Sequence, residues 1–127
     1  MADILYLFGY SLFGSNQFEQ IIPLIKNQLA KEIHVSVVLL QDAVVGTNNK
    51  GTTPNSLKEL IEFASQLKNL GNVIGVEPPI RLHIYVLKED LEARGFNGEN
   101  LIPRLELIDY GKLVDIMDES EKIVSWM

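Results

Sequence analysis

The sequence predicts a small α/β domain, built as three layers with helices on both faces of a mainly parallel sheet. Short, continuous apolar runs of strand length end in glycine or polar residues, which is typical of strands covered on both faces. Amphipathic segments with helical spacing alternate with these runs along the chain. Because this alternation indicates parallel strands joined by helices, we expect residues 1–127 to form one domain with a sheet of four to five strands.

Four apolar segments are predicted to be strands, and a fifth short one follows near the end of the sequence. They are residues 4–8, 35–40, 82–87, 105–108 and 123–126. Most are rich in β-branched or aromatic residues, which favour strands. Glu106 interrupts the apolar pattern of the fourth segment, so we expect that strand at a less covered edge of the sheet.

Four amphipathic segments are predicted to be helices. They begin near Asn16, Pro54, Glu89 and Tyr110. Pro23 lies inside the first and predicts a kink or a later start, while Gly71 predicts the end of the second. The first is expected to bury Phe18, Ile21, Ile22, Ile25 and Leu29, and the last Tyr110, Leu113, Val114 and Met117. Residues 43–53 are polar without apolar periodicity, so we expect them to be the least ordered internal connection.

Composition and charge exclude several classes of function. The formal net charge of −6 opposes direct binding to nucleic acid, because such binding depends on basic residues that neutralise phosphates. Cysteine is absent, which excludes disulfides and thiolate chemistry by this chain. No apolar run reaches the roughly 18 residues that a membrane span needs, and the N-terminus lacks the basic start of a signal peptide. We therefore expect a cytoplasmic protein without membrane contact.

Polar residues follow the predicted strands at the edge where α/β sheets bind their ligands. They are Tyr10 and Ser11 after the first strand, Gln41 and Asp42 after the second, Lys88, Glu89 and Asp90 after the third, and Asp109 and Tyr110 after the fourth. Carboxylates here could serve acid–base catalysis, but capping and turn roles are favoured. His34 and His83 have no neighbouring metal-ligand residues in the sequence, so we predict no metal site.

The stretch FGYSLFGSN, after the first strand, has Gly9 and Gly14 at the spacing of a phosphate-binding loop. Ser15 and Asn16 stand where such a loop has Lys followed by Ser or Thr. We therefore interpret the stretch as a strand-to-helix turn, with a phosphate cradle of backbone amides as the alternative. No catalytic constellation is complete.

Three stretches, in order along the chain, resemble motifs of the DsrH/TusB family of sulfur-relay subunits. They are LLQDAV at 39–44, IYVLKEDLEARG at 84–95 and IDYGKLV at 108–114, followed by Trp126 near the end. The resemblance implies a DsrE/F/H-like fold of flavodoxin-like topology. It also implies assembly with DsrE/TusD-like and DsrF/TusC-like subunits that pass persulfide sulfur between proteins.

The resemblance further implies where the sulfur goes and which residues contact the partners. The sulfur would serve 2-thiouridine formation at the tRNA wobble position or dissimilatory sulfur metabolism. Since some members carry an early cysteine that this chain lacks, we expect a non-catalytic subunit without a cofactor or an independent enzyme activity. The motif residues Asp42, Asp90, Arg94, Asp109 and Tyr110, with Trp126, are expected at the interface. The alternatives are a homo-oligomer and a small nucleotide- or flavin-binding protein that uses the carboxyl edge of the sheet.

Overall fold

The computed structural model describes residues 3–13, 16–49, 51–73 and 81–127, and its centre is a parallel sheet. The strands are β1 (Ile4–Phe8), β2 (Val35–Leu39), β3 (Leu82–Leu87), β4 (Leu105–Ile108) and β5 (Lys122–Trp126). They lie in the order β4-β3-β2-β1-β5, and each neighbouring pair is parallel. The predicted fold class is confirmed. The first strand of flavodoxin itself lies between the second and third, whereas here β1 lies between β2 and β5.

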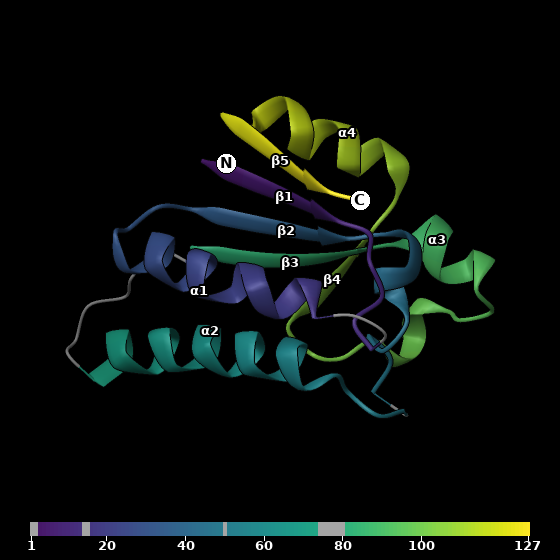
Figure 1. Cartoon of the computed structure of the whole chain (residues 1–127), viewed down its shortest axis with the longest axis horizontal. Helices are drawn as coiled ribbons and strands as arrows, with labels where there is room; N and C mark the ends of the chain where they lie inside the picture. The colour runs from purple at the N-terminus through teal and green to yellow at the C-terminus, as the bar shows by residue number, and fades with distance from the viewer. Residues whose placement is uncertain (1–2, 14–15, 50, 74–80) are drawn as a thin grey trace.

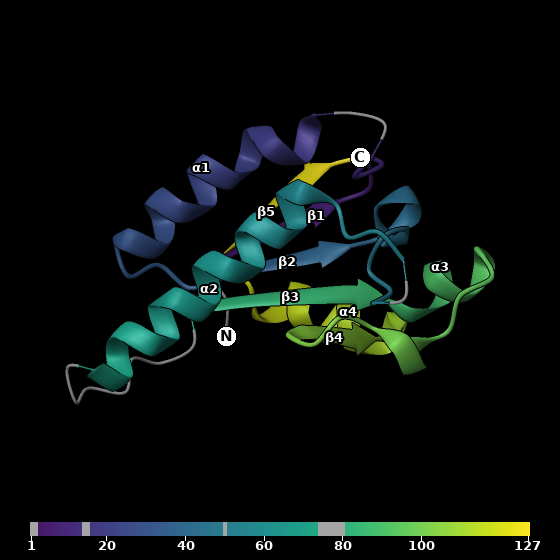
Figure 2. The same cartoon turned by 90° about the horizontal axis from the view of Figure 1, so that it is seen from below.

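Helices cover both faces of this sheet, which makes the predicted three layers. The long helices are α1 (Gln17–Ala30), α2 (Asn55–Val73) and α4 (Tyr110–Glu119). Helices α1 and α2 lie side by side on one face, and α4 lies on the other (Figures 1 and 2). The short helix α3 (Lys88–Ala93) and the 3-10 turns η1 (Gln41–Val44) and η2 (Gly98–Asn100) lie beyond the carboxyl ends of the strands.

The two faces of the sheet form separate hydrophobic cores because successive side chains of a strand point to opposite faces. Tyr6 and Phe8 of β1 belong to the core under α1 and α2. Leu5 and Leu7 belong to the core under α4. Strands β1 and β2 are therefore buried on both faces, as their continuous apolar runs predicted.

Helix α1 buries the predicted stripe, namely Phe18, Ile21, Ile22, Ile25 and Leu29. The later start expected at Pro23 was wrong, because the helix begins at Gln17 and is assigned without interruption to Ala30. Pro23 is exposed, so water can reach the carbonyl of Glu19 that loses its helical partner. Helix α2 likewise continues past Gly71 to Val73, since a glycine inside a helix costs only about 1 kcal/mol.

Helix α4 faces the sheet with a different stripe from the predicted one. Ile116 is buried, and Leu113 and Met117 pack against the same core. Tyr110 and Val114 are 53% and 55% exposed, so their predicted burial was wrong. The helix carries apolar residues on two adjacent faces. Only the face formed by Leu113, Ile116 and Met117, at positions i, i+3 and i+4, packs against the sheet.

The described part of the connection at residues 43–53 is more structured than its polar sequence predicted. Thr47 is fully buried, and its carbonyl accepts the backbone N–H of Ile102 at 2.8 Å. The N–H of Asn49 donates to the carbonyl of Asn100 at 2.7 Å, beside an antiparallel bridge between Asn48 and Leu101. Because these partners come from distant sequence, local periodicity could not reveal them.

Candidate functional site at the carboxyl edge of the sheet

The carboxyl ends of the parallel strands meet at one edge, where α3, η1 and the following loops gather (Figure 1). The chain leaves β1 and β2 towards the face covered by α1 and α2, but it leaves β4 towards the face covered by α4. Ligands of open α/β sheets bind outside the carboxyl ends of the strands. This edge is therefore the candidate functional site.

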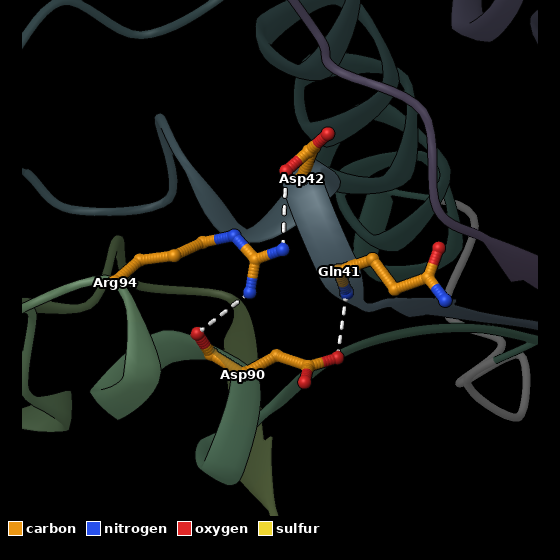
Figure 3. Close-up of polar contacts among 4 residues, drawn as sticks. All are labelled: Gln41, Asp42, Asp90 and Arg94. Atoms are coloured by element: carbon orange, nitrogen blue, oxygen red, sulfur yellow. Dashed lines mark hydrogen bonds and ion pairs between the residues drawn. The ribbon is translucent and has the colours of Figure 1, made fainter.

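A carboxylate from α3 holds the backbone that follows β2. Oδ2 of Asp90 accepts the backbone N–H of Gln41 at 2.6 Å (Figure 3). Gln41 has a φ of 51°, in the left-handed region that residues with a side chain rarely adopt. Strained backbone of this kind persists only where surrounding contacts fix it, and it occurs often at functional sites.

Arg94 joins the same two segments from the end of α3. Its Nη2 lies 3.1 Å from Oδ1 of Asp42, and its Nη1 donates to the backbone carbonyl of Asp90 at 3.2 Å (Figure 3). The Arg94 side chain is 30% exposed and that of Asp42 is 70% exposed, so the pair is accessible from solvent. We call Gln41, Asp42, Asp90 and Arg94 the edge cluster.

The two predicted site residues after β4 lie at the start of α4. Asp109 caps this helix, because its Oδ1 accepts the backbone N–H of Lys112 at 2.9 Å. The N–H of Tyr110 donates to Oε2 of Glu89 at 3.3 Å, while the phenol ring of Tyr110 is largely exposed. Oε1 of Glu89 is buried and has no hydrogen-bond partner among the described residues. Glu89 therefore links the start of α3 to the start of α4 where β3 and β4 end.

Tyr10, Ser11 and Trp126 lie at the ends of β1 and β5. The carbonyl of Trp126 accepts the N–H of Gly9 at 2.9 Å, and the Trp126 side chain packs partly against the core under α1 and α2. Tyr10 is 40% exposed and meets Phe8 edge to face, and Ser11 Oγ accepts a backbone N–H within its own turn. These contacts do not include the edge cluster.

Gln41 connects the two groups of predicted site residues. A Cβ atom added at Gly9 would lie 2.7 Å from Oε1 of Gln41, so the amide side chain lies directly over this glycine. A side chain at position 9 would require the end of the Gln41 side chain to move. The predicted turn in FGYSLFGSN agrees with its described part, but Gly14 and Ser15 lie outside the described residues, and the alternative of a phosphate cradle stays untested.

A pocket of about 360 Å³ opens at the same edge, and the sequence did not predict it. Its lining consists of Phe13, Val45, Gly46, Asn48, Gly51, Thr52 and Phe96. Phe13 and Phe96 are lining residues that the sequence did not place at the site, whereas Gln41 and Glu89 were predicted at this edge without a specific role. The available signal was the position of Phe13 and Phe96, two large apolar residues next to glycine in predicted loops.

The two histidines lie away from this edge, and no metal cluster is found in the described part of the chain. His83 is on β3, where its ring stacks on Tyr85 at 5.9 Å between centroids. Within the described ranges, no group of three or more His, Asp or Glu side chains is placed to hold a metal ion. No helix among the described residues is long and apolar enough to cross a bilayer.

A comparison with protein families finds a match in the C-terminal part of the chain. Residues 77–123 match the family model of DsrH-like proteins. This range contains Asp90, Arg94, Asp109 and Tyr110, and it leaves out Asp42 and Trp126. A search of curated proteins finds no significant match.

Solved structures match the whole chain in fold. The chain is similar to the ychN protein from E. coli, with a TM-score of 0.74 and 15% identity, over 99% of this chain and 100% of the other. It is also similar to MTH1491, a protein of unknown function from Methanobacterium thermoautotrophicum, with a TM-score of 0.63 and 12% identity over 98% and 99% of the two chains. At these identities the likeness concerns the fold. The resemblance to DsrH-like proteins is confirmed for residues 77–123, the part of the chain that the family model matches.

Proposed function

We propose that this chain is a non-catalytic subunit of a sulfur-relay complex of the DsrH/TusB type. The match of residues 77–123 to the DsrH-like family carries the proposal, because this range holds two of the three motifs that resemble that family. The third motif contains Asp42, and Asp42 forms an ion pair with Arg94 of the matched range. Asp42 and Arg94, which come from two different motifs, are thus neighbours in space.

The persulfide would be carried by a partner. Sulfur transfer of this kind requires a thiolate, and the 127 residues contain no cysteine. DsrE/TusD-like and DsrF/TusC-like subunits are the partners that the resemblance implies. In this arrangement the chain contributes a recognition surface and no reacting atom.

The edge cluster is the part of that surface with the strongest physical argument. A partly buried arginine whose orientation is fixed by two contacts suits an interface, because little conformational freedom is lost on binding. The exposed rings of Tyr10 and Tyr110 lie on the same edge of the sheet and supply the aromatic contact area that interfaces favour. Trp126, which is partly buried, is proposed as a further anchor.

The destination of the sulfur is the finer part of the proposal. Formation of 2-thiouridine at the tRNA wobble position and dissimilatory sulfur metabolism are the two candidates. With a formal net charge of −6, this chain is a poor tRNA-binding surface, so a partner would make any tRNA contact.

Affinity purification of the tagged chain from its native cells, followed by native mass spectrometry, tests the proposal. We expect a cysteine-bearing DsrE-like protein at a fixed stoichiometry. Recovery of only a monomer or a homo-oligomer would contradict the relay role. Alkylation of the recovered complex with a thiol reagent then shows which subunit carries the reactive sulfur.

The pocket at the same edge favours a second candidate, a small nucleotide- or flavin-binding protein. A ligand that binds only the folded chain raises its unfolding temperature by mass action. A thermal-shift screen with nucleotides and flavins on the purified chain separates this candidate from the relay subunit, which requires no such ligand.

A further inference from the structure

The pocket of about 360 Å³ is built from three separate segments of the carboxyl edge. Phe13 comes from the turn after β1, and Phe96 follows α3. The connection after η1 contributes Val45, Gly46, Asn48, Gly51 and Thr52. The hydrogen bonds of Thr47 and Asn49 to the segment at 100–102 fix one wall against the rest of the fold. The pocket is therefore part of the folded framework.

The ring of Phe13 packs against Gly46 although the residue is 53% exposed. A Cβ atom added at Gly46 would lie 2.8 Å from Cε2 of Phe13 and 2.9 Å from the ring of Pro54, so Phe13 rests directly on the glycine backbone. Gly46 also has a φ of 99°, which favours glycine. On the other side, the backbone N–H of Phe13 donates to Ser11 Oγ at 3.2 Å.

Phe96 is fixed by the turn that ends α3. Gly95, with a φ of 84°, reverses the chain, and the N–H of Phe96 then donates to the carbonyl of Leu91 at 3.1 Å. The side chain is nevertheless 36% exposed. Two aromatic rings from distant segments thus line one pocket while both keep accessible surface.

The lining also restricts the kind of ligand. None of the described lining residues carries a charge, and Lys50, which lies next to Gly51 in sequence, is outside the described residues. The volume lies near the lower end of the range for small-molecule sites, which suits a single ring system. Exposed aromatic side chains bind planar rings by stacking, without a need for charge.

We propose that this pocket binds a planar, uncharged heteroaromatic ring, which stacks on Phe13 and Phe96. The inference does not rest on the sulfur-relay role, since the pocket residues lie outside the edge cluster. The inference makes the second candidate function more specific. The chain would recognise the ring of a nucleotide or flavin, and the phosphate would contribute little to the binding free energy.

Equilibrium dialysis of the intact chain with riboflavin and adenosine tests the proposal. Both probes carry a planar ring system without phosphate. We expect at least one to bind, and Phe13→Ala and Phe96→Ala each to weaken it about tenfold. Phe13→Tyr keeps the ring and should keep the affinity. Leu24→Ala is the matched control, because Leu24 is 45% exposed on α1 and does not line the pocket.

Three outcomes would overturn the inference. One is that neither riboflavin nor adenosine binds the wild-type chain. Another is that binding is unchanged in both alanine variants, while their unfolding temperatures show that they are folded. The third is that riboflavin 5′-phosphate or AMP binds more than tenfold tighter than its unphosphorylated counterpart, because the phosphate would then dominate recognition. Binding of the partner subunit to the Phe13→Ala variant is measured in a separate experiment. If the pocket binds no ring, that experiment still tests the sulfur-relay role.

Discussion

Asp90 and Gln41 are 49 positions apart in the sequence, and the carboxylate of the first holds the backbone of the second at 2.6 Å. The bond joins the end of β2 to the start of α3, which follows the neighbouring strand β3. It also fixes Gln41 in a left-handed conformation that costs roughly 1–2 kcal/mol. The edge cluster is therefore a strained turn held by a distant side chain.

Replacement of Asp90 by alanine should lower the free energy of unfolding by about 1–2 kcal/mol. The charged acceptor of the Gln41 N–H is lost, and water at this exposed site replaces it only in part. Urea denaturation measures the change. Glu92→Ala is the matched control, because Glu92 is an exposed carboxylate on the same helix. An equal, small effect of both substitutions would show that the bond does not hold the turn.

Arg94→Ala should weaken association with the partner more than it lowers the melting temperature. The Asp42–Arg94 pair is 30–70% exposed, and ion pairs of this kind contribute only about 0–1 kcal/mol to folding. An arginine at the centre of an interface can contribute more than about 2 kcal/mol to binding. Isothermal titration with the recovered partner and a thermal melt of the same sample give the two values.

Lys31→Ala provides the control for Arg94→Ala. Lys31 is exposed and follows α1, at the end of the sheet opposite the edge cluster. It should change neither value. If Arg94→Ala lowers the melting temperature strongly and leaves the affinity unchanged, Arg94 serves the fold and not the interface.

Asp109→Ala should destabilise the chain by about 1 kcal/mol, because Asp109 caps α4 through the N–H of Lys112. Asp109→Asn should restore most of this stability, since asparagine caps helices about as well. Chemical denaturation of both variants checks the cap. If Asp109→Asn has native stability but loses partner binding, the carboxylate charge also serves the interface.

Individual residues show which parts of this structure could be predicted from sequence. The strands and the α1 stripe follow from local apolar patterns, and Glu106 alone was enough to indicate that β4 is an edge strand. The carboxyl edge could be predicted because parallel strands end together. The actual contacts, such as Asp90 with the Gln41 backbone, join residues that only the tertiary fold brings close.

The incorrect predictions also depend on contacts that only the tertiary fold creates. Thr47 is buried by pairing with the chain near Ile102, a partner that local sequence does not reveal. Val114 belongs to an apolar stripe as regular as that of Ile116, and the packing of α4 decides between them. Phe13 and Phe96 line one pocket because β1 and α3 end at the same edge, although 83 positions separate them.

His83 should make the stability of the fold fall as the pH decreases. Burial lowers the pKa of His83 below its ordinary value of 6.5, and nearby Arg104 and His34 act in the same direction, while Glu106 opposes them with a smaller effect than burial. The unfolded chain therefore takes up the proton first as the pH falls through about 6.5, which favours unfolding. The contribution of neutral His83 to stability is therefore complete above about pH 6.5. It is lost as the pH falls from there through the lower pKa of His83 in the folded state.

The His83→Gln variant separates the effect of His83 from the effect of the carboxylates. The carboxylates are the same in the wild type and in the variant, so only the titration of His83 differs. Thermal unfolding of the wild type and the variant is compared at about pH 7.5 and about pH 5.5. Loss of the ring stack on Tyr85 lowers the stability of the variant at both values, so the quantity that matters is the change between them. We expect the wild type to lose more stability than the variant over this interval. If the two lose the same amount, protonation of His83 is not linked to folding.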